Sequence, residues 1–369
     1  MHHKVLFIID SDGVGGVEKR FSNLFKHLAD LNSSDINKDV TFLVNKKLEK
    51  KINNYKTQIN NNKLKLLLFG TTIKIPFVNK IISRFTELLS IIFYSILFKL
   101  NFDTVVFVTT RSLRYLPLIK ARNKILVVYA YTINPDLKMF EKYGRLAQRG
   151  FLFDCLSEDI ANILSTNNFI KANQVFVTPN SFIDFSNTEV KYEEKKNIVT
   201  FLARFDKKKG TDLLLDTIDC VLKERNDIHF QVIGYGPEKN TIINHINKNN
   251  YGLFVSIIFS EEPKKQLKLS KVFLSIQLKE NYPSQALLEA MACKNAIVAT
   301  DVGLTYKLVD NENGLRVNPK GTDIAKAIIY LYNNPKQMEK KGFNAREKIL
   351  QNCTAENYFK YITSILINR

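Results

Sequence analysis

The run 271–302, KVFLSIQLKENYPSQALLEAMACKNAIVATDV, constrains the fold most, because it reads as strand, loop, helix and strand in close succession. Residues 272–276 and 296–300 are short apolar runs rich in β-forming residues, of a length that suits strands buried in a parallel sheet. Between them, Pro283 and Ser284 mark the start of a helix, and Ser284 is placed to cap its free amides. A helix that begins at the carboxyl end of a parallel strand presents N–H groups and its positive dipole end, which suits a phosphate.

The same alternation of strands and helices fills the rest of the chain. A polar, charged segment without apolar periodicity, 184–197, divides it into two parts. A chain of 369 residues exceeds what one hydrophobic core usually holds. We therefore expect two α/β domains with a cleft between them, at 1–183 and 198–353, joined by a linker at 184–197. Apolar runs predict strands at 5–9, 40–44, 64–69, 104–108, 125–129, 151–157 and 175–177, and then at 198–202, 228–233 and 255–259.

Cysteine usage and charge narrow the class of protein. The 4 cysteines are scattered without a CxxC pair or a histidine cluster, so neither a disulfide framework nor a zinc site is predicted, and a reducing cytoplasm fits. The N-terminus runs straight into a strand and lacks the pattern of a signal peptide. The net charge is +18, and residues 1–184 carry 26 Lys and Arg against 15 Asp and Glu. A basic surface attracts phosphates of any kind, but these residues are dispersed and form no nucleic-acid module, so we expect no nucleic-acid partner.

A glycine-rich turn, DSDGVGGVEKRF, follows the first predicted strand. Gly15 and Gly16 allow the backbone to approach a ligand closely, because they lack the side chain that would block it. The turn does not have the GxGxxG spacing of a dinucleotide site. Asp10 and Asp12 have the spacing of a metal-binding pair, but they end a first strand and no further ligands converge there, so we expect no metal.

Two cations follow the strand predicted at 198–202. Arg204 lies just past the strand end and Lys209 just before the next helix, so they can flank a diphosphate at a helix mouth that also supplies free amides. The strand at 228–233 ends in a second glycine turn, with Gly234 and Gly236. This turn either lets a ligand lie against the backbone or is an ordinary strand-to-helix turn.

The stretch ENYPSQALLEAMACKNAIVATDVG resembles the donor-binding motif of the retaining glycosyltransferases of the GT-B fold, family four, also called glycosyl transferases group 1. In that motif two glutamates flank a turn, and the second stands in the phrase LEAMA, which is present here at 288–292. Eight residues separate Glu280 from Glu289, one more than in the family pattern. Either an extra loop residue lets Glu280 keep the first position, or Asn281 takes its place.

The resemblance implies a retaining hexosyltransferase with two Rossmann-like domains that needs neither a metal nor another cofactor. Arg204 and Lys209 would hold the diphosphate of a UDP- or GDP-linked sugar, and Glu280 would orient the sugar as the third catalytic residue. The segment 354–369 would be a helix that crosses back onto the first, acceptor-side domain. The donor-binding residues implied by the motifs are Gly15, Gly16, Gly234, Gly236, Asn281, Pro283, Ser284, Gln285 and Glu289.

The acceptor implied is a glycan or a lipid-linked molecule, in the assembly of bacterial surface polysaccharide or lipopolysaccharide. Two other functions stay open. One is a nucleotide-sugar epimerase of the same fold, against which the scarcity of histidine counts. The other is a non-catalytic protein that binds sugar nucleotides at a membrane.

The largely apolar segment 78–100 has two interpretations. It is either a crossover helix packed on the sheet or a helix that also rests on an anionic membrane surface, beside Lys74, Lys80 and Arg84. Its apolar block, 88–98, is too short to span a bilayer. We expect a cytoplasmic protein, either free or peripheral on the inner face of the plasma membrane.

Overall fold

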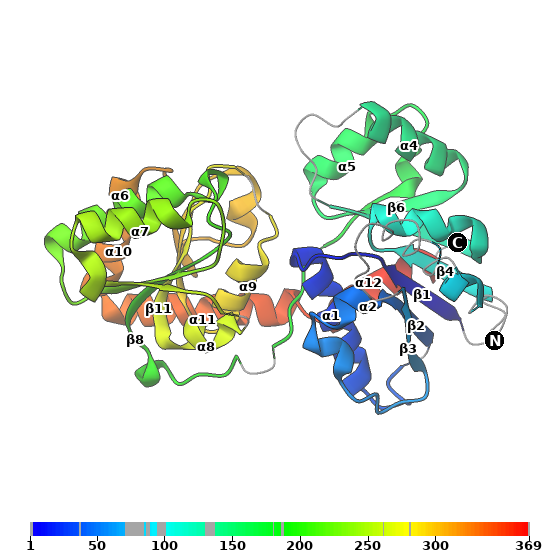
Figure 1. Ribbon diagram of the computed structural model, residues 1–369, viewed down its shortest axis with the longest axis horizontal. Helices are drawn as coiled ribbons and strands as arrows, with labels where there is room; N and C mark the ends of the chain where they lie inside the picture. Colours follow the sequence, from blue (N-terminus) through cyan, green and yellow to red (C-terminus); the bar gives the residue numbers. More distant parts are fainter. Residues whose placement is uncertain are drawn as a thin grey trace. The chain divides into compact units, whose positions relative to one another are not determined.

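The structure is a computed structural model, and it describes the chain except for residues 1–2, 37, 71–84, 86–88, 94–100, 130–136, 180, 186–187, 261, 280–281 and 368–369. The chain forms two compact units (Figure 1). The first unit is Met1–Asp184 together with Ala355–Arg369, and the second unit is Phe185–Thr354. Most of the apolar segment 78–100, including Lys80 and Arg84, and also Lys74 lie outside the described residues. No helix in the described part of the chain is long and apolar enough to cross a membrane.

The first unit is built on a parallel sheet of seven strands in the order β3-β2-β1-β4-β5-β6-β7. From Val5 to Ile9 the central strand β1 is an unbroken apolar run that is buried on both faces, as parallel strands between two layers are. The helix α1 turns Phe21, Leu24, Phe25 and Leu28 towards the core. The strands are β1 (Lys4–Ile9), β2 (Asp39–Asn45), β3 (Leu64–Phe69), β4 (Asn101–Phe107), β5 (Lys120–Val128), β6 (Phe151–Cys155) and β7 (Val175–Val177), and the helices are α1 (Gly16–Asp30), α2 (Lys46–Glu49), α4 (Leu137–Gln148), α5 (Glu158–Ser165) and α12 (Ala355–Ile367).

The second unit is built on a parallel sheet of six strands in the order β10-β9-β8-β11-β12-β13. Helices cover both faces of this sheet: α6, α7 and α10 lie on one side, and α8, α9 and α11 on the other (Figure 1). The strands are β8 (Lys196–Leu202), β9 (His229–Ile233), β10 (Val255–Ile258), β11 (Ser270–Ser275), β12 (Ala296–Thr300) and β13 (Gly314–Val317), and the helices are α6 (Thr211–Glu224), α7 (Lys239–Lys248), α8 (Pro263–Leu269), α9 (Gln285–Ala292), α10 (Gly321–Asn333) and α11 (Pro335–Asn352).

Short 3-10 helices punctuate the loops of both units. They are η1 (Asn53–Lys56), η2 (Thr110–Leu118), η3 (Ala172–Gln174), η4 (Tyr192–Glu194), η5 (Lys207–Lys209), η6 (Tyr251–Leu253) and η7 (Gly303–Lys307). Two of them, η2 and η5, follow the carboxyl ends of β4 and β8. They therefore shape the loops at the edge of the sheet where ligands of such folds bind.

Both sheets reverse their strand order beside their first strand. In the first unit β1 lies between β2 and β4, and in the second unit β8 lies between β9 and β11. Such a reversal is a topological switch point, where the loops on the two sides turn away from each other and leave a crevice outside the carboxyl ends of the strands. Each unit therefore offers one position at which a ligand can meet loops from several strands.

The helix α12 completes the core of the first unit. Its residues Tyr358, Ile362 and Ile365 are buried in that core. The hydroxyl of Tyr358 donates to the buried carboxylate of Asp154 at 3.0 Å, and the hydroxyl of Tyr361 donates to the same carboxylate at 2.8 Å. The segment expected to form the last helix is thus held on the first unit by apolar packing and by two hydrogen bonds.

The segment 184–197, which the sequence indicates as a linker, is packed against the second unit over much of its length. Thr188 and Val190 are buried, and the guanidinium of Arg346 on α11 donates to Thr188 Oγ1 at 3.0 Å. Lys195 is 5% exposed, and its Nζ donates to Ser270 O at 2.6 Å. Polar side chains here pair with specific partners far away in the sequence, so their polarity does not mean that the segment is solvated.

Candidate functional site

The loop after β8 is joined to the loop after β9 at the switch point of the second unit. The N–H of Ala203 donates to Ile233 O at 3.1 Å, and the N–H of Phe205 donates to Tyr235 O at 2.8 Å. Arg204 lies between these two bonded residues, and its side chain is exposed. Its backbone is therefore fixed while its guanidinium is available at the carboxyl edge of the sheet.

The glycine turn after β9 owes its composition to this contact. Gly234 and Gly236 have φ values of 150° and 154°, which residues with a side chain rarely adopt. A Cβ atom on Gly234 would lie 1.9 Å from Ala203 O, and one on Gly236 would lie 2.3 Å from Phe205 O. Both glycines are thus required by the close packing of the two loops.

The same loop then runs against the exit of β11. Gly210 has a φ of 85°, and a Cβ atom there would lie 1.7 Å from Ile276 O. The N–H of Leu278 donates to Lys208 O at 3.4 Å. Lys209 is half-buried in this loop. Burial lowers the pKa of Lys209 below the usual lysine value, and the nearby charge of Asp206 opposes that shift.

The helix α9 begins after β11 as the sequence predicts. Ser284 is its N-cap, and Ser284 Oγ accepts the N–H of Leu287 at 3.3 Å. Glu289 lies four residues after the first helical residue, Gln285, and is 8% exposed. Side chains of a helix tilt towards its N-terminus, so a residue at this position is suited to reach a ligand bound at the first turn of α9.

Most of the predicted donor residues therefore converge on one edge of the second unit. Arg204, Lys209, Gly234 and Gly236 come from the loops after β8 and β9, and Pro283, Ser284, Gln285 and Glu289 come from the start of α9. Glu280 and Asn281 lie outside the described residues. Gly15 and Gly16 belong to the first unit, where Gly15 is the N-cap of α1 and its N–H donates to Glu18 Oε2 at 2.9 Å.

Two arginines that the sequence analysis did not single out stand at the switch point of the first unit. Arg111 Nη1 lies 2.6 Å from Asp12 Oδ2, and Arg114 Nη2 lies 2.7 Å from Asp10 Oδ2. The two aspartates considered for a metal therefore contact guanidinium groups, and the described residues hold no group of three or more potential His, Cys, Asp or Glu metal ligands. Arg111 and Arg114 follow the end of β4 as Arg204 and Lys209 follow the end of β8, so position relative to a strand end was the signal that could have found them.

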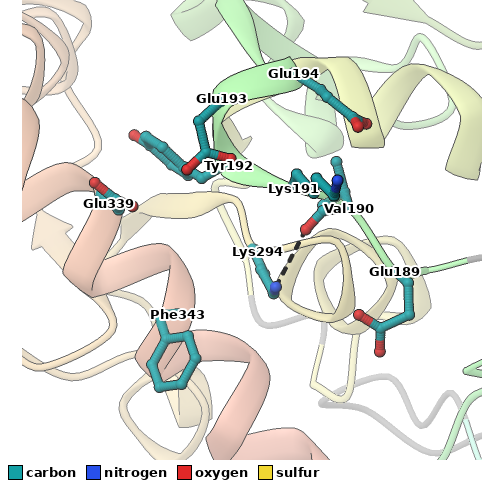
Figure 2. A pocket seen from close by; sticks show the side chains of 9 residues that line it. All are labelled: Glu189, Val190, Lys191, Tyr192, Glu193, Glu194, Lys294, Glu339 and Phe343. Carbon is teal, nitrogen blue, oxygen red and sulfur yellow. Dashed lines mark hydrogen bonds between the residues drawn. The ribbon is translucent and has the colours of Figure 1, made fainter.

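A cavity of about 600 Å³ opens at the amino ends of β8 and β12, on the edge of the sheet opposite to these loops (Figure 2). Residues 189–194 line it together with Lys294, and Glu339 and Phe343 reach it from α11. Two of the lining residues are joined, because the Nζ of Lys294 donates to Val190 O at 3.1 Å (Figure 2). None of the predicted donor residues lines this cavity.

The two parallel sheets, each with helices packed on it and with one reversal of strand order, define an α/β protein, and its likeness to solved structures gives the GT-B fold. Residues 183–348, which make up most of the second unit, match the family model described as glycosyl transferases group 1. The resemblance drawn from the sequence is confirmed at this level. So is the expected fold class.

Known proteins agree with this assignment. A poly(ribitol-phosphate) α-N-acetylglucosaminyltransferase of Staphylococcus aureus is 28% identical over 245 residues, which cover 64% of this chain and 45% of that protein. HepE of Anabaena, solved in complex with UDP, superposes with a TM-score of 0.74 at 14% identity and covers 99% of this chain and 100% of its own. A mutant of S. aureus TarM, solved with fondaparinux, α-GlcNAc-glycerol and UDP, superposes with a TM-score of 0.72 at 16% identity, over 99% of this chain and 100% of its own. The chain spans about half the length of the curated relatives that it matches.

Proposed function

We propose that the protein is a glycosyltransferase that moves a hexosyl group from a nucleotide-diphosphate sugar to a glycan or lipid-linked acceptor. The observation that carries the proposal is the convergence of Arg204, Lys209 and the start of α9 at the switch point of the second unit. A nucleotide diphosphate needs cations, free amides and a ribose contact at one place, and this edge supplies groups suited to all three.

The chemistry we propose is stabilisation of the leaving group. When the glycosidic bond to the diphosphate breaks, negative charge grows on the phosphate oxygens. This negative charge would be stabilised, without a metal ion, by the guanidinium of Arg204, the ammonium of Lys209 and the amides at the start of α9. Lys209 is half-buried, so its charge is less screened than that of a solvated lysine.

The other donor contacts follow from the same arrangement. Glu289, near the first turn of α9, would accept hydrogen bonds from the ribose hydroxyls. The sugar hydroxyls would be oriented by Glu280 or by Asn281. Gly15 and Gly16 of the first unit would let backbone approach the donor.

We propose that transfer retains the anomeric configuration through a front-face route. The acceptor oxygen forms its bond to the anomeric carbon on the face from which the diphosphate leaves. The acceptor's proton passes to an oxygen of the departing phosphate, so that the bond formed, the bond broken and the proton balance without a covalent sugar–protein intermediate.

The relatives indicate which donor and acceptor to try first. HepE and TarM were solved with UDP, and the curated S. aureus relative acts on poly(ribitol-phosphate). We propose a UDP-sugar donor ahead of a GDP-sugar, and an acceptor from bacterial surface polysaccharide synthesis, reached by a cytoplasmic protein that is free or peripheral on the membrane.

The test is transfer by purified protein, after a thermal-shift screen of UDP, GDP and their common sugars has identified the donor. Lys209→Ala and Arg204→Ala should each lower kcat by roughly a hundred- to a thousandfold, because each removes a group placed against charge that grows in the transition state. Lys207→Ala is the matched control, since Lys207 is exposed in the same loop, and it should stay within about twofold. Near-parental turnover of both site variants would refute the diphosphate assignment.

A further inference from the structure

A cationic cluster occupies the switch point of the first unit, where the carboxyl ends of β1 and β4 lie side by side. Its anchor is Asp10, whose side chain is 0% exposed. Arg114 Nη2 lies 2.7 Å from Asp10 Oδ2, and Arg111 Nε lies 3.4 Å from the same oxygen. A buried carboxylate therefore holds two guanidinium groups that come from one loop.

Several further hydrogen bonds fix the geometry of this cluster. Asn45 Nδ2 at the end of β2 donates to Asp10 Oδ1 at 3.1 Å, and Thr109 Oγ1 donates to Asp10 O at 3.0 Å. Arg111 Nη1 donates to Asp12 Oδ2 at 2.6 Å, and Lys51 Nζ donates to Asp12 O at 2.6 Å. Three strand ends are thus tied together by polar contacts, so the guanidinium groups are held in place before any ligand arrives.

The guanidinium groups remain accessible from solvent. The side chains of Arg111 and Arg114 are 39% and 30% exposed. An arginine that only neutralised a buried aspartate would not need a second arginine beside it. Here the pair presents planar, forked donors at the sheet edge, in the arrangement that suits the oxygens of a phosphate.

The charge of the cluster favours an anion. Partial burial alone would raise the pKa of Asp12, but the hydrogen bond and charge of Arg111, with the charges of Lys47 and Lys51, lower it below its usual value. Four cations therefore face the two carboxylates of Asp10 and Asp12. The excess is positive, and it lies in a part of the chain where Lys and Arg outnumber Asp and Glu by 26 to 15.

We propose that Arg111 and Arg114 bind a phosphate group of the acceptor, which makes the substrate class a phosphate-bearing polyol or lipid. This proposal rests on the proposed function, and on the acceptor-side role that the family resemblance implies for the first domain. The donor diphosphate has its own cations, Arg204 and Lys209, on the second unit. Asp10 and Asp12 act here as positioning residues for the arginines.

The experiment compares binding of ribitol 5-phosphate and ribitol to the 369-residue chain by calorimetry. The parent should bind the phosphate form and not the free polyol. Arg111→Gln should raise the Kd for ribitol 5-phosphate by about tenfold to a hundredfold, as expected for the loss of charge-assisted hydrogen bonds. Arg111→Lys keeps the positive charge but loses the forked guanidinium donors. Its Kd for ribitol 5-phosphate should lie between that of the parent and that of Arg111→Gln.

Arg149→Gln is the control. Arg149 is exposed in the same unit, and it precedes β6 at the amino edge of the sheet, so its loss changes the net charge equally but should leave the Kd unchanged. Thermal unfolding of each variant shows whether it is folded. Should Arg111→Gln fail to fold, Arg111→Lys decides the matter, because it keeps a cation beside the buried carboxylate of Asp10.

A parallel arm separates a soluble acceptor from a lipid one, with phosphatidylcholine vesicles that contain phosphatidylglycerol. Vesicle binding weakened by Arg111→Gln, without binding of ribitol 5-phosphate, would assign the phosphate to a lipid. Equal effects of Arg111→Gln and Arg149→Gln, or no effect of Arg111→Gln in either arm, would overturn the proposal. So would a loss confined to the binding of the nucleotide diphosphate, because the anion would then be the donor. The proposed function would survive any of these failures as long as Lys209→Ala still lowers kcat for transfer strongly.

Discussion

Burial lowers the pKa of a lysine side chain, and the second unit contains two such residues, Lys209 and Lys195. Lys209 is half-buried beside the loop after β11 and has a pKa below the usual lysine value. A lowered pKa means that the ammonium, which the proposed diphosphate site requires, is lost at a lower pH than in a solvated lysine. The chemistry of the site should therefore have an alkaline limit set by one side chain.

We predict that kcat/KM for the donor falls on the alkaline side at a lower pH than a solvated lysine would set, because burial lowers the pKa of Lys209 and the free enzyme then loses its proton. The profile of kcat/KM is the right measurement, since it reports groups of the free enzyme. Lys209→Arg should move the alkaline limb upwards, as a guanidinium does not titrate in this range. An unchanged limb in that variant would mean that another group sets the limit.

Single residues also show where sequence reasoning succeeds and where it stops. Arg204 and Lys209 could be found because each stands within a few residues of a strand end. Arg111 and Arg114 stand equally near a strand end, but their partner Asp10 is about 100 residues away in sequence. No local pattern shows that one buried carboxylate joins these two arginines, so only the folded chain shows the cluster.

Among the elements, those with a complete local signature were predicted best. The strand β12 spans Ala296–Thr300 as predicted, and Ser284 caps α9 as predicted. The strand β5 was predicted at 125–129 but spans Lys120–Val128. Its first residues are polar and largely outside the core, so apolar periodicity missed them, although the backbone hydrogen bonds to β4 continue.

The C-cap of the 3-10 helix η5 is Gly210, whose left-handed backbone conformation is easily adopted only by glycine. Gly210→Ala should lower the melting temperature and weaken nucleotide binding together, because a Cβ atom would meet Ile276 O at 1.7 Å and the φ of 85° is strained for alanine. Gly252→Ala is the control, since nothing lies within 4 Å of the added atom. Thermal unfolding with and without nucleotide measures both effects, and matching curves for the two variants would contradict the prediction.

The element that leads into β8 should make stability depend on pH. Burial lowers the pKa of Lys195 from 10.5 to about 7. Between these values the unfolded chain binds more protons than the folded chain, so the free energy of unfolding should rise with pH by an amount on the order of 4 kcal/mol. Below about pH 7 the cost of burying the charge is present in full.

Chemical denaturation from pH 7 to 10 measures this dependence. Lys195→Met should flatten the rise, because the variant has no proton to lose at that position. Lys196→Met changes an exposed neighbour and should keep the parental slope. A parental slope in Lys195→Met would show that other groups cause the dependence.

At the scale of the molecule, the chain consists of two compact units, each with most of its contacts inside itself. The second unit runs without interruption from Phe185 to Thr354 and contains its own sheet and core. Its sequence also carries the family match. That match begins at residue 183, at the end of the first unit. Loops that select a ligand differ between proteins of one fold. That is why the fold could be predicted from sequence and the acceptor could not.

We predict that residues 183–354, expressed alone, fold cooperatively and bind the nucleotide diphosphate with a Kd within about tenfold of the full chain. The reason is that Arg204, Lys209 and Glu289 all belong to that unit. Circular dichroism and calorimetry provide the two readouts, and Lys209→Ala in the same fragment is the control for specific binding. A folded fragment without affinity would place essential donor contacts on the first unit.

The return of α12 to the first unit reverses the order of folding relative to the order of synthesis. On the ribosome, residues 1–184 emerge before the whole of Phe185–Thr354, and only then do Tyr358, Ile362 and Ile365 arrive to close the first core. Domains fold as units during synthesis, so the second unit can reach its native state while the first still exposes the apolar surface that α12 will cover. We therefore expect chaperones to bind the nascent first unit, because its apolar surface stays exposed until α12 arrives.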